Sequence, residues 1–297
     1  MVKICQIGFG RWGKKVANSF SSKDNLLYIT DLLLNNNNLP ENKSNIFYLP
    51  YQPISVIHKE FCPDAYYLAL PQAVQRNVIV QIPPHIPILV EKPAIGNSWK
   101  IGYIETYRPL NSIAVGHTFL QCNGFQYIIN QLKLSNDPIC IYSERINTNG
   151  PIRTDINCIE DFGIHDVSLF VGLIKQKYKI ISSDLTKVEY FYNNRFGARF
   201  VVNYNNLFLD VTVSWIGKEK KRDWYVHFNN ETLYWNAIKD IVTSSYSGIA
   251  VPQNLQDKTP LQKQYDLLIK WVETGIFPVQ LHSLEDAKIC AQIMEQL

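Results

Sequence analysis

The chain has 297 residues, of which 46% are hydrophobic and 19% are charged. These fractions exclude a disordered chain, and the length suits two domains of ordinary size. A net charge of +3 is too small to indicate binding to nucleic acid or to a membrane surface. The six cysteines form no Cys-x-x-Cys pair and no apolar run reaches about 18 residues. We therefore expect reduced thiols, no metal site and a soluble, cytoplasmic protein.

The first segment of the chain is typical of a dinucleotide-binding unit. A short apolar strand at 2–7 leads into the turn Gly8-Phe9-Gly10-Arg11-Trp12-Gly13 and then into a helix at 14–20. In this context Gly8 permits a tight turn, Gly10 lets the backbone approach a pyrophosphate, and Gly13 lets the helix pack close to the sheet. The pyrophosphate would bind at the helix N-terminus, where free N–H groups and the helix dipole favour an anion.

A second apolar run, at 26–30, ends on Asp31. This carboxylate is placed to accept hydrogen bonds from the adenosine ribose hydroxyls. It would repel a 2′-phosphate, and no lysine or arginine follows it before Lys43, so NAD is expected rather than NADP. Arg11 and Trp12 of the turn are also expected to contact the cofactor, although an ordinary core contact is equally consistent for Trp12.

After a polar loop at 35–45, strands and helices alternate. Helices are predicted at 54–61, 73–82 and 98–107, and buried strands at 64–70, 87–90 and 113–116. This alternation predicts a doubly wound parallel Rossmann sheet, in which ligands bind beyond the carboxyl ends of the strands. Several residues at those ends should therefore line one cofactor crevice: Gly8, Leu70, Pro71, Gln75, Glu91, Lys92 and His117. For His117, a structural hydrogen bond is an equally good interpretation.

The second half of the chain changes character. Strands are predicted at 139–148, 187–192, 198–204, 207–215 and 224–228, and helices at 159–174, 261–274 and 284–296. Short strands separated by asparagine-rich turns predict an open, mainly antiparallel sheet, here in a C-terminal α+β domain. We therefore expect a cofactor domain at 1–119 and a substrate and oligomerisation domain at 120–297. The last helices can pack back on the first domain.

Three motifs in this order resemble the Gfo/Idh/MocA oxidoreductase family: the glycine turn, Glu91-Lys92-Pro93, and the segment from Asp161 to Asp166. A narrower resemblance is to its nucleotide-sugar and amino-sugar dehydrogenase branch. It is carried by four stretches: 8–13, 115–120, 149–155 together with 161–166, and Ser214-Trp215 followed by Lys218 and Arg222. The resemblance implies that Lys92 and His165 are catalytic, that Asp161 lies beside them, and that the Lys92–Pro93 bond is cis. Departures from the family pattern are Gln75, where relatives have a histidine, and a short second half.

The residue types suit this chemistry without the resemblance. Hydride transfer between a carbinol and nicotinamide needs a group for the hydroxyl proton and a cation for the developing alkoxide. Lys92 could supply either function, and a histidine such as His165 suits proton transfer because it titrates near neutral pH. Asp161, four residues earlier on the same helix face, could bind a sugar hydroxyl or orient His165.

Cations in the second half suggest an anionic substrate. Arg153 could clamp a phosphate or form a surface ion pair, and the Lys218–Arg222 segment could receive a diphosphate or form a solvated hairpin. We expect an NAD-dependent sugar oxidoreductase, with a nucleotide-linked substrate preferred and a homodimer or homotetramer formed through the C-terminal sheet. The alternatives are a dehydrogenase of a small free sugar or cyclic polyol, and a catalytically silent dinucleotide-binding sensor. Retention of Lys92, Asp161 and His165 favours an enzyme.

Overall fold

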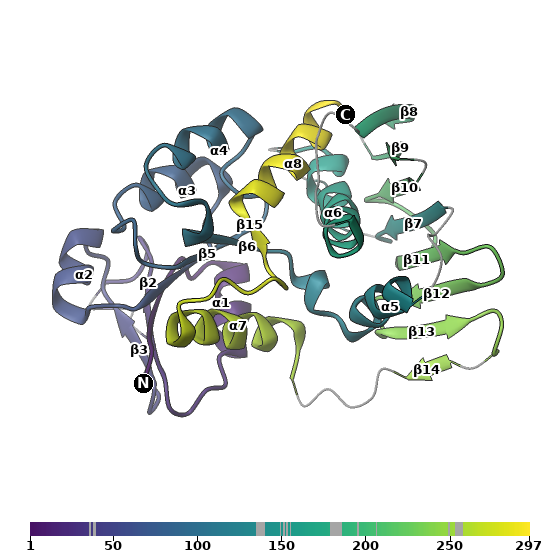
Figure 1. The fold of residues 1–297 in the computed structure, drawn as a ribbon. Coiled ribbons are helices and arrows are strands. Elements are labelled where there is room, and N and C mark those ends of the chain that lie inside the picture. Colours follow the sequence, from purple (N-terminus) through teal and green to yellow (C-terminus); the bar gives the residue numbers. More distant parts are fainter. Residues whose placement is uncertain are drawn as a thin grey trace. The chain divides into compact units, whose positions relative to one another are not determined.

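The computed structural model describes residues 1–35, 37, 40–134, 140–148, 150, 152, 154, 156–178, 186–194, 196–205, 207–248, 250–252 and 258–297. The chain divides into two compact units, each with its own hydrophobic core (Figure 1). Unit 1 consists of Met1–Thr118 and Lys258–Lys288, and unit 2 consists of Phe119–Asp257 and Ile289–Leu297. None of the helices in the described part of the chain has both the length and the apolar character needed to cross a membrane.

Unit 1 is built on a seven-stranded sheet in the order β15-β6-β5-β4-β1-β2-β3. Six strands are parallel, and β15 pairs with β6 in the antiparallel direction. Side chains of β4, β5 and β6 are buried on both faces, as is usual for parallel strands covered by helices. The strands are β1 Lys3–Ile7, β2 Leu26–Thr30, β3 Ile46–Leu49, β4 Ala65–Leu68, β5 Ile88–Glu91, β6 Ile113–Gly116 and β15 His282–Ser283.

Five helices of unit 1 cover this sheet, with α1 and α7 on one face and α3 and α4 on the other (Figure 1). They are α1 Arg11–Ser19, α2 Ile54–Phe61, α3 Gln72–Ile79, α4 Ser98–Glu105 and α7 Pro260–Thr274. The bounds of α7 follow from its sequence. Thr259 and Gln262 form a capping box around the first helical residue, Pro260, and Gly275 ends the helix with φ +68°. Tyr265 and Leu268 of α7 join Val16 and Ala17 of α1 in the core.

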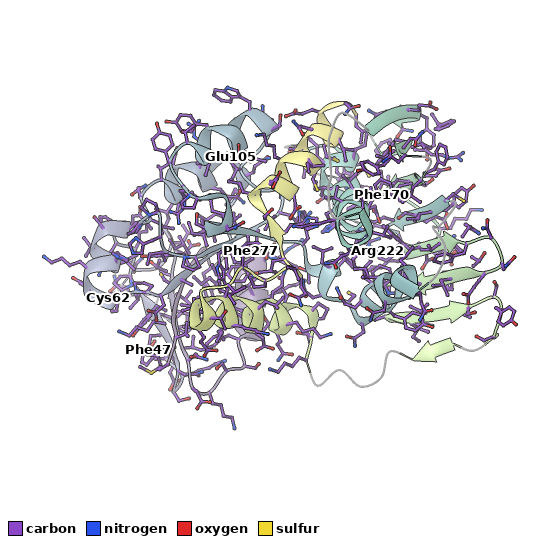
Figure 2. All side chains as sticks on the ribbon, in the orientation of Figure 1. Phe47, Cys62, Glu105, Phe170, Arg222 and Phe277 are labelled. Carbon is purple, nitrogen blue, oxygen red and sulfur yellow. The ribbon has the colours of Figure 1, made fainter. Side chains whose placement is uncertain are left out.

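Unit 2 contains an eight-stranded sheet in the order β14-β13-β12-β11-β7-β10-β9-β8, in which only β7 and β10 are parallel neighbours. α5 (Asn123–Leu134) and α6 (Ile164–Tyr178) cover one face, and Phe170 of α6 is fully buried in the core (Figure 2). α8 (Leu284–Glu295) contributes Ile289 and Ile293 to this core. The strands are β7 Cys140–Ile146, β8 Thr186–Asn194, β9 Gly197–Tyr204, β10 Leu207–Ser214, β11 Lys221–His227, β12 Thr232–Asn236, β13 Ile241–Ser244 and β14 Ala250–Pro252.

Partly exposed aromatic side chains share one face of this second sheet. Tyr142 of β7, Tyr225 of β11 and Tyr234 of β12 occupy paired positions on three adjacent strands. The rings of Tyr225 and Tyr234 stack with centroids 4.9 Å apart. On the neighbouring strands Arg199 and Asp210 form an exposed ion pair at 2.7 Å. Self-association through this sheet stays a prediction.

The fold class expected from the sequence, a Rossmann sheet followed by an α+β domain with an open sheet, is confirmed. The sequence patterns missed β3, α5 and the strands β12 to β14. β3 is only four residues long and follows a polar loop, so it has too few residues to display a period. The predicted helix at 159 opens with a π-helical turn, Ile159–Gly163, before α6 begins.

Candidate active site

The glycine turn after β1 has two glycines that the protein's own packing requires. Gly8 has φ +105°, and a Cβ there would lie 2.3 Å from the carbonyl oxygen of Ala69. A Cβ on Gly13 would lie 2.3 Å from the carbonyl oxygen of Gly8. Gly10 is different, because no atom of the described residues lies within 4 Å of a Cβ built on it. The open space beside Gly10 is therefore available to a ligand.

The first turn of α1 begins at this glycine and has no side-chain cap. Gly10 is the N-cap residue, and it offers no side chain to the N–H groups that follow. Backbone N–H groups at a helix N-terminus form a natural anion site, especially where glycine lets a phosphate come close. The turn thus fits the pyrophosphate of a dinucleotide.

A buried glutamine holds the turn in shape. Gln6 is fully buried, and its Nε2 donates to the carbonyl oxygens of Gly8 at 2.8 Å and Gly13 at 2.9 Å. The hydroxyl of Tyr265, on α7, donates to Gln6 Oε1 at 3.1 Å. Sequence reasoning missed both residues. The signal was a single polar side chain inside an apolar strand, which must find partners when buried.

Asp31 lies at the end of β2 and contacts the same turn. Its Oδ2 accepts the Phe9 N–H at 2.6 Å, and its Oδ1 accepts the Leu33 N–H at 2.9 Å. The two bonds fix the carboxylate beside the glycine turn. An ionised carboxylate has about four acceptor positions, so it can still accept hydrogen bonds from ribose hydroxyls.

Glu91, at the end of β5, is a buried acid that connects three elements. Its Oε1 accepts the Tyr67 hydroxyl at 2.7 Å, and the Trp12 side chain also hydrogen-bonds to the carboxylate. Burial raises the pKa of Glu91, and these hydrogen bonds oppose the rise. The sequence left open whether Trp12 contacts the cofactor or the core. In the structure Trp12 hydrogen-bonds to Glu91 and is 41% exposed, so part of its side chain remains accessible to a ligand.

The loop that carries Lys92 is held by Gln75. The Lys92–Pro93 peptide bond is cis, as the family resemblance implies. Gln75 is fully buried and its Nε2 donates to the carbonyl oxygens of Leu70 and Glu91, at 3.1 and 2.9 Å. Its Oε1 accepts the Ile95 N–H at 2.7 Å. A histidine has only two ring nitrogens and could not make all three bonds, so Gln75 is suited to fix the backbone on both sides of Lys92.

Two buried histidines, His117 and His282, pack together beside β6. β15 pairs with β6 so that His282 is opposite Val115, and the rings of His117 and His282 meet edge to face at 5.1 Å. Burial lowers the pKa of His117 well below its usual value, and the charges of His282 and Lys92 lower it further. His117 is therefore a neutral side chain at pH 7. Sequence reasoning missed His282 because only the antiparallel pairing of β15 brings it to β6.

In unit 2, Asp161 lies in the π-helical turn that precedes α6. Its Oδ2 accepts the indole N–H of Trp215 at 3.2 Å. The segment from Asp161 to His165 runs from this π turn into α6, and the shared face of the two side chains stays a prediction. Such turns often occur at functional sites. His165, the second residue of α6, packs its ring edge-on against Phe119 at 5.2 Å.

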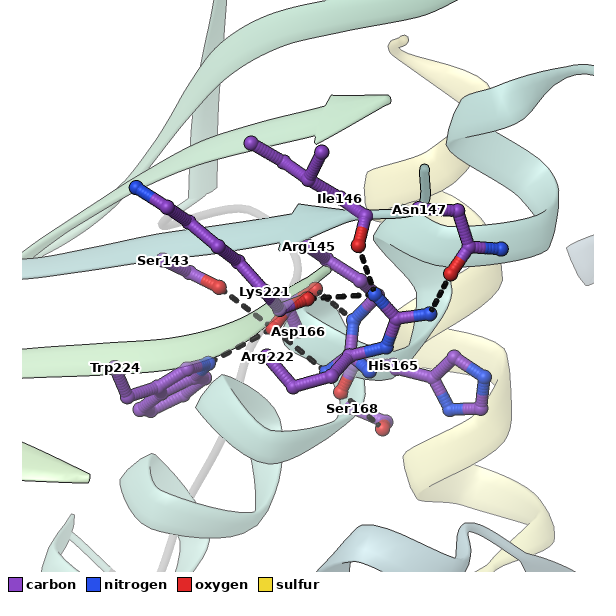
Figure 3. Close-up of polar contacts among 10 residues, drawn as sticks. All are labelled: Ser143, Arg145, Ile146, Asn147, His165, Asp166, Ser168, Lys221, Arg222 and Trp224. Atoms are coloured by element: carbon purple, nitrogen blue, oxygen red, sulfur yellow. Dashed lines mark hydrogen bonds and ion pairs between the residues drawn. The ribbon is translucent and has the colours of Figure 1, made fainter. Parts of the chain in front are cut away.

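Arg222 lies beside the same π turn. Its guanidinium carbon is 4.8 Å from the ring centroid of Phe162. Its Nη1 donates to the carbonyl oxygens of Ile146 at 2.8 Å and Lys221 at 2.6 Å, and its Nη2 donates to Asn147 Oδ1 at 2.7 Å (Figure 3). Burial, followed by the charge of Arg145, lowers the pKa of Arg222 to about 10. The Arg222 side chain is therefore held against unit 2 by hydrogen bonds and does not project from a solvated hairpin.

The described lysines of this segment have surroundings that differ from those of Arg222. Lys221 pairs with Glu144 at 3.1 Å and with Glu219 at 3.4 Å, whereas Lys218 and Lys220 are exposed. Arg153 lies outside the described residues. Among the described residues, no group of three or more histidine, cysteine, aspartate or glutamate side chains could hold a metal ion.

No family model and no curated protein matches this sequence. Solved structures with the same fold include UDP-N-acetylglucosamine 3-dehydrogenase GnnA from Acidithiobacillus ferrooxidans, with TM-score 0.77 and 16% identity over 99% of this chain and 96% of that one. A myo-inositol dehydrogenase from Corynebacterium glutamicum has TM-score 0.75 and 12% identity, covering 99% and 95%. A Gfo/Idh/MocA family oxidoreductase from Vibrio cholerae has TM-score 0.74 and 14% identity, covering 99% and 95%. The fold of this chain is therefore that of the Gfo/Idh/MocA oxidoreductases.

The raised pKa of Glu91 predicts a specific pH dependence of stability. Because the folded protein holds this proton more tightly than the unfolded chain does, the free energy of unfolding should fall as the pH rises from about 4.3 through the folded-state pKa. Glu91→Gln removes this titration. The variant should therefore gain stability relative to the wild type as the pH rises through that window, by ~1.4 kcal/mol for each unit of pKa difference. Urea unfolding between pH 4 and 8 measures it.

Glu60→Gln is the matched control, since Glu60 is an exposed residue on α2. Its pH dependence of unfolding should follow that of the wild type. Parallel pH curves for Glu91→Gln and the wild type would show that Glu91 titrates as an ordinary glutamate.

Proposed function

We propose that this protein is an NAD(H)-dependent oxidoreductase that transfers hydride between nicotinamide and a ring carbinol or ketone of a sugar. The observation that carries the proposal is the glycine turn. Packing requires Gly8 and Gly13, whereas Gly10 leaves open space beside an uncapped helix N-terminus. Residues 1–119 would hold the cofactor, and residues 120–297 would hold the substrate. The shared fold with dehydrogenases supports this proposal.

The cofactor contacts follow from the geometry of unit 1. The turn from Gly8 to Gly13, with Arg11 and Trp12, would receive the pyrophosphate, and Asp31 would receive the ribose hydroxyls. The segments after the strands would line the nicotinamide end: Leu70, Pro71, Gln75, Glu91, Lys92 and His117. When bound, the nicotinamide supplies the hydride acceptor or donor.

The catalytic roles fall to residues that can move or stabilise a proton. Lys92 would stabilise the developing alkoxide with its ammonium group, next to the neutral His117. His165 would exchange the hydroxyl proton, and Asp161, held by Trp215, would accept a hydrogen bond from a sugar hydroxyl. Retention of these three residue types supports an enzyme over a catalytically silent sensor.

The substrate proposed is a nucleotide-linked sugar. Arg222 uses three hydrogen bonds to fix itself beside the π turn, and a guanidinium has five N–H donors, so it can also bind a phosphate oxygen. Arg153 is proposed as a second anion contact from the sequence alone. One solved structure with the same fold is a UDP-N-acetylglucosamine 3-dehydrogenase. The runner-up is a small cyclic polyol or free sugar, since another is a myo-inositol dehydrogenase.

Cofactor titration tests the first part of the proposal. The wild type should bind NAD(H) more tightly than NADP(H), because the Asp31 carboxylate repels a 2′-phosphate. Gly10→Ala should weaken binding of NAD(H) by about tenfold or more, because its Cβ occupies the space where the pyrophosphate approaches. Calorimetric titration of both proteins with both cofactors gives these affinities.

Gly10→Ala should keep the wild-type melting temperature, because Gly10 has φ −67° and free space for a Cβ. An unchanged affinity of this variant for NAD(H) would show that the pyrophosphate does not bind at the glycine turn. Tighter NADP(H) binding by the wild type would overturn the cofactor choice. In that case Lys14, whose ammonium lies 5.5 Å from the Phe9 ring centroid, would be the next residue to substitute, as the cation that could bind the 2′-phosphate.

The catalytic roles predict that Lys92→Ala and His165→Ala each lower kcat by about two orders of magnitude or more, with cofactor affinity nearly unchanged. Single-substrate kinetics and cofactor titration on the same preparations measure both quantities. Lys59→Ala and His85→Ala, at exposed positions, are the matched controls and should keep wild-type turnover. A folded Lys92 or His165 variant with wild-type kcat would refute the role of that residue.

The substrate class is tested by comparing nucleotide-linked and free sugars in one set of variants. Arg222→Ala should lower kcat/KM for the nucleotide-linked sugar by about ten- to a hundredfold, equivalent to ~1.5–3 kcal/mol for a charge-assisted hydrogen bond. Its effect on the free sugar should be much smaller. Arg153→Ala is expected to act in the same direction.

This comparison separates a lost phosphate contact from a general disturbance of unit 2, because such a disturbance would lower the activities on the nucleotide-linked and the free sugar together. Lys220→Ala, at an exposed position two residues away, is the control. Equal efficiency on both sugars with both arginines dispensable would favour the small-polyol alternative.

A further inference from the structure

The residue that follows His165 is one of the most completely bonded carboxylates in unit 2. Asp166 is 1% exposed. Its Oδ1 accepts the Ser143 hydroxyl at 2.7 Å, the Trp224 indole N–H at 2.8 Å and Arg145 Nη2 at 3.0 Å (Figure 3). Its Oδ2 accepts Arg145 Nε at 2.7 Å. The start of α6 is thereby fixed to two neighbouring strands, β7 and β11.

Arg145 reaches His165 by a second route. The guanidinium lies over the ring of Phe119, with its carbon 4.5 Å from the ring centroid. The same Phe119 ring meets the His165 imidazole edge-on, with centroids 5.2 Å apart and an angle of 79° between the planes. One buried arginine therefore fixes the backbone next to His165, through Asp166, and the aromatic ring against which the imidazole packs.

The chemistry of arginine matters to this arrangement. A planar guanidinium can bind one carboxylate through two parallel N–H groups and still present its flat face to an aromatic ring. Lysine has the same charge, but it is concentrated on one ammonium group. Lysine therefore cannot form two parallel hydrogen bonds with the carboxylate and also stack on the ring. A buried arginine paired with an aspartate also has a large desolvation cost, which makes the pair a poor device for stability alone.

We infer that Arg145 and Asp166 are positioning residues for His165, acting through the Asp166 backbone and the Phe119 ring. This inference rests on the proposed catalytic role of His165. A misplaced catalytic group loses turnover while substrate and cofactor still bind, since small displacements cost large factors in rate. The pair should therefore control kcat rather than KM.

The test is Arg145→Lys, which keeps the charge and removes the fork and the flat face. It should lower kcat by about ten- to a hundredfold, with KM and cofactor affinity within about twofold of the wild type. Phe119→Leu removes only the aromatic ring between Arg145 and His165, and it should also lower kcat. This variant provides the test if Arg145→Lys does not fold. Circular dichroism at the assay temperature confirms that each variant is folded.

Arg199→Lys is a closely matched control. Arg199 also binds an aspartate with two N–H groups, Asp210 at 3.0 and 2.7 Å, and its guanidinium lies 5.0 Å from the ring centroid of Phe191. It lies on the same sheet but is 44% exposed, and these partners lie on β10 and β8 rather than on α6. Its substitution by lysine should leave kcat unchanged.

The double variant distinguishes positioning from general stabilisation. In a His165→Ala background, Arg145→Lys should cause no further loss of the residual kcat, because a residue that acts through His165 has nothing left to position. Multiplicative losses in the double variant, or wild-type kcat in folded Arg145→Lys and Phe119→Leu, would overturn the inference. Wild-type kcat in His165→Ala would instead overturn the proposed function, so the two failures are distinguishable.

Discussion

A carboxylate removed from water must be fully hydrogen-bonded, and both units of this protein use that requirement beside a proposed catalytic residue. In unit 1 the buried Glu91 precedes Lys92 and binds Tyr67 and Trp12. In unit 2 the buried Asp166 follows His165 and binds Arg145, Ser143 and Trp224. Each acid fixes a short stretch of backbone to its own sheet, and the functional side chain is carried on the adjacent residue. The proposed catalytic residues are thus held by neighbouring acids that take no part in the proposed reaction.

Much of the fold could be predicted because parallel strands buried on both faces are nearly continuous apolar runs. β4, β5 and β6 follow this rule, and the glycine turn has a recognisable spacing. Apart from α5, the elements that were missed are short strands: β3, β12 to β14 and β15. β15 has only two residues and exists because it pairs with β6, which no local pattern reports. The π turn at Ile159–Gly163 was also invisible, since its apolar residues match an α-helical pattern.

The residues of the candidate site differ in how visible they are in the sequence. Lys92, Asp161 and His165 stand out by residue type and order, whereas Gln6, Arg145 and His282 gain meaning only from partners far away in the sequence. A polar side chain in a buried strand indicates that it has a hydrogen-bond partner, but the sequence does not identify that partner. Gln75 illustrates the opposite case. It looked like a departure from a titrating histidine, yet its three backbone hydrogen bonds explain why an amide suits the position.

The bond between Tyr265 and Gln6 joins residues 259 positions apart, and it has a consequence for how the protein is made. Chains emerge from the ribosome N-terminus first, and domains generally fold as units. Here α7 and β15 of unit 1 are synthesised only after nearly all of unit 2. A nascent chain that already exposes the glycine turn still lacks the helix that orients Gln6 and the edge strand that brings His282 to His117. Completion of unit 1 therefore waits for the synthesis of nearly all of unit 2, and the edge of β6 that β15 later covers stays unpaired during that interval.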